Sequence, residues 1–132
     1  MRTLALLLAL GLAACDTADA PPYPASARSG EVTLAIGQSA SLDGLAVTFE
    51  AVRTDSRCPA TVECVWEGEA IVALTLGGAA HDVRVADPEA RPEDGVEVGA
   101  VVVFAAALTP EPRADAPVDV PHSVTLVSYP AP

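Results

Sequence analysis

The segment from Asp55 to Ala70 holds the side chains best suited to chemistry, because two of the three cysteines lie in it. Five residues separate Cys58 from Cys64, and such a pair can form a disulfide, ligate a metal ion or act as a redox couple. A redox couple favours two intervening residues, and a zinc site needs a second ligand pair. The pair therefore predicts a disulfide. Metal binding by the two cysteines with nearby acids or His81, taking copper or zinc, is the alternative.

The same segment also carries side chains suited to recognition. Asp55, Ser56, Pro59 and Thr61 favour turns, so residues 55 to 62 are predicted to form a rigid loop. Its charges do not have the ligand spacing of a known calcium loop, and we assign no metal ion or cofactor to them. The sequence instead predicts a candidate binding loop, made of Asp55, Arg57, Glu63, Trp66 and Glu67.

A strand must position the end of this loop. From Cys64 to Leu76 apolar and polar residues alternate, which is typical of a half-buried strand. Cys64 and Trp66 fall on its apolar face and are expected to point inward together. Gly77-Gly78 then predicts a tight turn into an antiparallel partner, in which His81 lies on the inner face.

The remaining chain predicts further strands and no helix. The strands are expected at Glu31–Ile36, Ser39–Leu42, from Leu45 with a bulge near Ala51-Val52, Val96–Leu108 as one strand covered on both faces, and Ser123–Tyr129. Asp43-Gly44 is typical of a hairpin turn, and Thr109–Pro121 contains four prolines and is expected to be a loop. The prediction is a single all-β domain over residues 30–132, an antiparallel β-sandwich or small barrel of about seven strands with one short-loop disulfide.

The amino end has the outline of an export signal. A single positive charge precedes the apolar run Leu4–Leu12, which is too short for a comfortable transmembrane helix. The following Leu12-Ala13-Ala14-Cys15 resembles the lipobox of bacterial lipoproteins. That resemblance implies removal of residues 1–14 as a signal peptide and lipidation of Cys15. Residues 15–29, rich in Pro, Ala and Ser, are expected to be a disordered tether.

Charge limits the partners of the exported chain. The full chain has a formal charge of −11, and removal of Arg2 with the signal leaves six arginines against eighteen acidic residues. Nucleic acid and anionic lipid surfaces would repel such a chain, so neither is expected to be recognised. The lipid anchor itself predicts a location in the bacterial cell envelope, on the inner or outer membrane, with the domain in the periplasm or at the cell surface.

A second resemblance concerns the domain. The GQSASLDGLAVTF strand pair, followed by DSRCP, CVW and EGEA, resembles an uncharacterised group of small secreted and lipoprotein β-domains over roughly residues 30 to 85. The resemblance implies a β-domain with a disulfide-closed loop. It carries no known activity, so it marks no catalytic residue in this chain. No G-x-S-x-G or H-E-x-x-H motif is present, so we expect no enzyme. The predicted function is a non-enzymatic envelope binding or accessory module for another protein or a saccharide.

Overall fold

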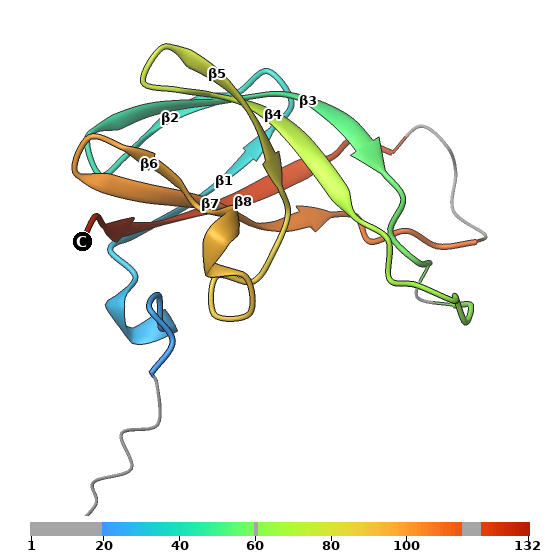
Figure 1. The fold of residues 1–132 in the computed structure, drawn as a ribbon. Coiled ribbons are helices and arrows are strands. Elements are labelled where there is room, and N and C mark those ends of the chain that lie inside the picture. The colour runs from blue at the N-terminus through green and yellow to red at the C-terminus, as the bar shows by residue number, and fades with distance from the viewer. Residues whose placement is uncertain (1–19, 60, 115–119) are drawn as a thin grey trace, which may run out of the picture.

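The computed structural model describes residues 20–59, 61–114 and 120–132 (Figure 1). They form two four-stranded antiparallel sheets with strand orders β1-β8-β7-β6 and β2-β3-β4-β5. The strands are β1 (Gly30–Ala35), β2 (Ser39–Leu42), β3 (Leu45–Asp55), β4 (Ala70–Leu76), β5 (Ala79–Arg84), β6 (Val96–Val98), β7 (Val101–Thr109) and β8 (Ser123–Pro130). The predicted all-β antiparallel fold is confirmed, as a sandwich with eight strands in the described part of the chain. The predicted signal peptide, residues 1–14, and the predicted lipidation site Cys15 fall outside these ranges. No helix within the described ranges is long and apolar enough to cross a membrane.

The core lies between the two sheets and follows the predicted alternation. Val47 and Phe49 of β3 and Val72 of β4 are fully buried, while their neighbours along each strand are more exposed or face the outer side. Each such side chain contributes about 1.5–3 kcal/mol when it is removed from water. One parallel bridge, between Val85 and Ala105, links the two sheets at an edge.

The two predicted hairpin turns are confirmed. Asp43 and Gly44 both have positive φ, 50° and 80°, and join β2 to β3 in the turn type that matches the twist of a hairpin. Gly77 and Gly78 similarly join β4 to β5, which pair from Ile71 with Arg84 to Leu76 with Ala79. The expected bulge in β3 is also present, as a register shift between Phe49 and Ala51.

The expected single strand from Val96 to Leu108 is wrong. The segment is a hairpin of β6 and β7 that turns at Gly99, whose φ is 60°. The expectation that both faces of this segment are covered is confirmed for β7, because Val102, Val103, Phe104 and Ala105 are all buried. The nearly continuous apolar run concealed the turn, since only Glu97 and Gly99 interrupt it.

The outer face of β7 and β8 is covered by the segment expected to be a tether. The ring of Tyr23 lies 5.0 Å from that of Phe104 and 5.3 Å from that of Tyr129, all three belonging to a second apolar cluster. A short 3-10 turn, Ala25–Ala27, follows, and the Ala25 amide donates a hydrogen bond to Glu89. Tyr23 and Ala25, which were expected to lie in a disordered tether, therefore contact the folded sheets and loops.

Candidate interaction site

The connection between β3 and β4 projects beyond the sheet as a narrow protrusion, residues 56–59 and 61–69, which we call the finger (Figure 1). At its base the Ser56 amide donates to the Glu69 carbonyl and the Cys58 amide to the Glu67 carbonyl, both at 2.8 Å. Gly68 makes this close approach possible. Its φ is +69°, and a Cβ atom there would lie 1.8 Å from the Ser56 carbonyl oxygen.

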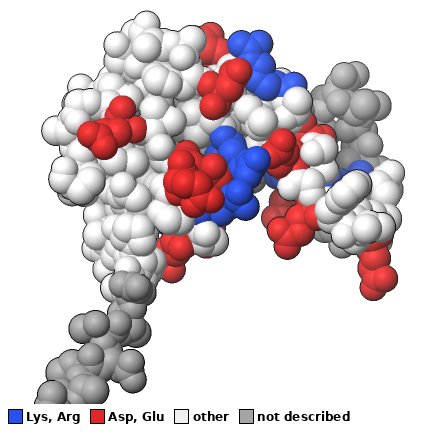
Figure 2. Space-filling model, in the orientation of Figure 1, with Lys and Arg blue, Asp and Glu red and all other residues white. Residues whose placement is uncertain are grey.

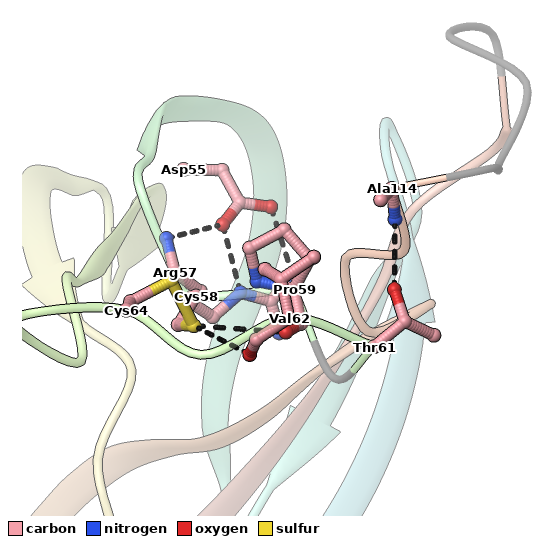
Figure 3. Close-up of a disulfide and its surroundings, with 8 residues drawn as sticks. All are labelled: Asp55, Arg57, Cys58, Pro59, Thr61, Val62, Cys64 and Ala114. Carbon is pink, nitrogen blue, oxygen red and sulfur yellow. Dashed lines mark hydrogen bonds and ion pairs between the residues drawn. A yellow bond between two sulfur atoms is a disulfide. The ribbon is translucent and has the colours of Figure 1, made fainter.

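The predicted disulfide closes the finger and is confirmed. Cys58 and Cys64 are joined, with their Cα atoms 5.9 Å apart (Figure 3). The bridge holds the outer half of the finger as a covalent ring above its hydrogen-bonded base. Val65 and Trp66 follow this ring in sequence and precede Glu67, whose carbonyl belongs to the base.

Arg57 fastens the finger to the first sheet. Its guanidinium forms a two-point contact with the Asp55 carboxylate, at 2.8 and 2.9 Å. The same group donates to the carbonyl of Leu108 at 2.8 Å and to that of Pro110 at 3.2 Å. The hydrogen bonds from Arg57 hold the pKa of Asp55 below its ordinary value.

The proline-rich connection between β7 and β8 lies beside the finger. The Ala114 amide donates to the Thr61 hydroxyl at 3.4 Å, a contact drawn in Figure 3. His122, at the far end of this connection, places its Nε2 atom 3.9 Å from the Asp55 carboxylate. The sequence analysis assigned no site role to His122, because its position before a strand gave no sign that the strand would begin beside Asp55.

The tip of the finger is apolar and exposed. Val65 is 97% exposed and Trp66 is 81% exposed, while Val62 is 45% exposed. The prediction that Cys64 and Trp66 point inward is therefore wrong, because β4 begins at Ala70 and the positive φ of Gly68 breaks the alternation before it. Among the described residues, Ile36 is the one other large apolar side chain so exposed, and it lies at the turn after β1.

Acidic side chains border the apolar tip. Glu63 and Glu67 are exposed, and no ion pair within the described ranges neutralises either. Figure 2 shows the finger as a lobe standing off the body of the domain, with acidic side chains along its otherwise largely uncharged surface. Glu69 is different, because it pairs with Arg84 at 2.5 Å. A shallow depression of about 390 Å³ lies where Trp66 meets the base of the finger, lined by Ser56, Trp66, Gly68 and Glu69.

The structure does not assemble the ligand set of the metal alternative. The sulfurs of Cys58 and Cys64 are bonded to each other, and His81 pairs with Leu74 within the sheet. In the described ranges no three His, Cys, Asp or Glu side chains lie close enough to hold a metal ion. Of the candidate loop residues, Asp55 and Arg57 pair at the base of the finger, and the Glu67 carbonyl belongs to the same hydrogen-bonded base. The side chains of Glu63, Trp66 and Glu67 are exposed.

A second depression, of about 380 Å³, lies at the other end of the β7–β8 pair. It is lined by residues that include Arg28, Asp87 and Tyr129. Arg28 is already paired with Glu31 at 2.6 Å, and its pKa is raised chiefly by the neighbouring Tyr129 hydroxyl. The cationic group of this depression is therefore engaged within the domain.

No protein-family model matches this chain, and neither a curated protein nor a solved structure is significantly similar to it. The class is therefore defined by the structure itself. The chain is a two-sheet antiparallel β-protein that presents a disulfide-closed finger from the end of one hairpin.

Proposed function

We propose that this chain is a lipid-anchored protein of the bacterial cell envelope that acts as a non-enzymatic binding or accessory module. Its recognition surface is the finger together with the adjoining described parts of the proline-rich connection. The observation that carries the proposal is the exposure of Val65 and Trp66 on a finger that the protein fixes covalently.

The finger has the properties of a preorganised binding loop. A disulfide, a hydrogen-bonded base and the Arg57 contacts restrict its conformations before any partner arrives. Such restriction lowers the entropy cost of association. Tryptophan is also enriched among the residues that dominate binding energy in protein interfaces. An exposed indole on a rigid loop is thus better explained by recognition than by folding, since it adds little to the core.

The position of the finger suits a protein held at its amino end. The amino-terminal segment enters the sheet where Gly30 pairs with Ser128, whereas the finger adjoins the opposite end, where Thr109 pairs with Ser123 (Figure 1). If the chain is anchored at Cys15, the anchor lies toward the Ser128 end of β8 and the finger lies at the Ser123 end, away from the membrane. A partner in the envelope can approach it there.

Affinity purification of the full-length lipoprotein from detergent-solubilised native membranes tests the proposal. The parent is compared with Trp66→Ala and with Ile36→Ala, which removes an exposed apolar side chain outside the finger. A stoichiometric envelope component, protein or saccharide, should be retained by the parent and by Ile36→Ala and lost with Trp66→Ala. Retention of the same component by all three would contradict recognition by the finger.

A further inference from the structure

We infer that the partner of the finger is a protein whose surface offers an apolar pocket bordered by Lys or Arg, and that Val65 and Trp66 enter this pocket. The inference rests on the proposed binding function and adds the chemistry of the partner. Three properties of the described finger residues support it. Apolar side chains are exposed, acidic side chains flank them, and the one cation is turned inward.

The exposed part supplies the apolar contact. Val65 and Trp66 are neighbours in sequence and are among the most exposed large apolar side chains of the described chain. A tryptophan buries about 150–250 Å² when it enters a pocket, which is enough for a central anchor. The depression formed by Trp66, Gly68 and Glu69 with Ser56 gives the indole a recess on one side, so a partner can contact the ring as well as the tip.

The surrounding charge specifies the rim of the pocket. Glu63 and Glu67 flank Val65 and Trp66 in sequence, and both are exposed. The other charges of the finger are engaged: Arg57 by Asp55 and two carbonyls, and Glu69 by Arg84. The net charge that the tip presents is therefore negative, within a chain of formal charge −11. Opposite charge on the partner speeds encounter and fixes orientation, and like charge would oppose it.

The missing charge argues against a bilayer as the occupant. Segments that rest on membrane surfaces combine Trp or Leu with Lys and Arg, which the anionic lipid attracts. The described finger has one cation, Arg57, and it is turned inward to Leu108 and Pro110. A protein pocket with a basic rim would bury the apolar residues of the finger and attract its acidic residues. An anionic bilayer would bury the apolar residues but repel the acidic ones.

Site-specific photo-crosslinking in intact cells tests the inference on the full-length lipoprotein. A benzophenone amino acid replaces Val65, and the same residue at Ile36 serves as the matched control, because both side chains are exposed. Illumination should give a protein adduct from position 65 and at most a weak one from position 36. Mass spectrometry should place the crosslink in the partner among apolar residues next to Lys or Arg.

Charge reversal provides a second readout. Glu63→Lys with Glu67→Lys should reduce the adduct from position 65 about tenfold, because the tip would then repel a basic rim. Glu97→Lys, an exposed charge reversal on β6, should leave the yield unchanged. An adduct that resists the double reversal, or that maps to an acidic surface, overturns the inference.

The remaining outcomes separate this inference from the proposed function. Benzophenone at Glu111, in the proline-rich connection, reports on the other part of the recognition surface. A protein adduct from position 111 without one from position 65 overturns the finger pocket and leaves the binding module standing. Lipid adducts from position 65 identify a membrane contact and overturn the inference. Absence of any protein adduct from positions 65 and 111 contradicts both.

Discussion

The guanidinium of Arg57 donates a 2.8 Å hydrogen bond to the carbonyl of Leu108, a residue 51 positions away in the chain. With its contacts to Asp55 and Pro110, this side chain joins the base of the finger to the end of β7 in the opposite sheet. The bond therefore links the finger, which connects β3 and β4 of one sheet, to β7 of the other sheet.

Replacement of Arg57 should weaken that link. Arg57→Ala should lower the free energy of unfolding by about 1–3 kcal/mol, because charge-assisted hydrogen bonds are lost and two carbonyls lose their donor. Arg57→Lys should lose less of the free energy of unfolding than Arg57→Ala does. It should still be less stable than the parent, since an ammonium cannot reproduce the two-point contact with Asp55. Urea denaturation followed by circular dichroism measures both. Arg53→Ala, which breaks an exposed pair with Asp82, is the control and should change stability by less than about 0.5 kcal/mol.

Removal of the disulfide should destabilise the protein modestly and leave the tryptophan emission unshifted. Cys58 and Cys64 are six positions apart, and closing this ring contributes at most about 2.4 kcal/mol through the unfolded chain. Cys58→Ser with Cys64→Ser should therefore melt lower. The indole is already 81% exposed, so its emission should stay that of a solvated ring. A blue-shifted parent spectrum that moves to the red in the variant would contradict the exposed placement of Trp66.

Gly68→Ala should open the base of the finger. Its Cβ would lie 1.8 Å from the Ser56 carbonyl oxygen, so the Ser56 and Cys58 hydrogen bonds would have to break. Amide exchange at Ser56 and Cys58 should become faster. Gly44→Ala is the matched control, because Gly44 also has positive φ but no atom lies within 4 Å of a Cβ there. It should cost only the backbone strain, about 1 kcal/mol, with no effect on the finger.

Acid should weaken the protein partly through Asp43. The carboxylate accepts hydrogen bonds from the hydroxyls of Ser29 and Ser128, which lower its pKa in the folded state. A group with a depressed folded pKa stabilises the fold above the unfolded value, near pH 4, and this contribution is lost as pH falls through the folded pKa. Asp43→Asn should melt below the parent at pH 7, and the two should converge as the pH falls through the lowered pKa of Asp43. If the difference in melting temperature between Asp43→Asn and the parent did not change with pH, the Asp43 carboxylate would not contribute to the acid sensitivity.

Cys15→Ser should release the protein from membranes. The variant removes the residue that the lipobox resemblance marks for acylation, and two or more acyl chains normally give stable anchoring. Fractionation of cells into soluble and membrane fractions measures the distribution. Cys58→Ser with Cys64→Ser is the control for loss of thiols and should remain in the membrane fraction. Tight retention of Cys15→Ser would reject the anchor.

Local patterns predicted most of the strands because they depend on neighbouring residues. Asp43-Gly44 and Gly77-Gly78 specify their turns, and alternation identified the buried side of β3 and β4. The same alternation misled for Trp66, because a period of two does not reveal where the opposing sheet ends. Trp66 lies before Ala70, where β4 begins, and it is 81% exposed, so no described part of the opposite sheet buries the face on which it was placed.

The contacts that hold the finger in place were harder to predict from the sequence. Arg57 and Asp55 are only two positions apart, but the bonds of Arg57 to Leu108 and Pro110 go to backbone carbonyls, which carry no sequence signal. Tyr23 was missed for a different reason. It was the one aromatic residue in a segment rich in Pro and Ala, and that isolation was the sign of a packing role.

The placement of the amino-terminal segment and the finger at opposite ends of β8 has a mechanical consequence. If the anchored end is held while a partner pulls on the finger, the pull on β1 runs along that strand. The six residue pairs between β1 and β8 would then be loaded in shear, all at once, instead of being opened one after another from an end. Such an arrangement lets a small domain carry tension between a membrane and a bound protein without unravelling from its anchored strand.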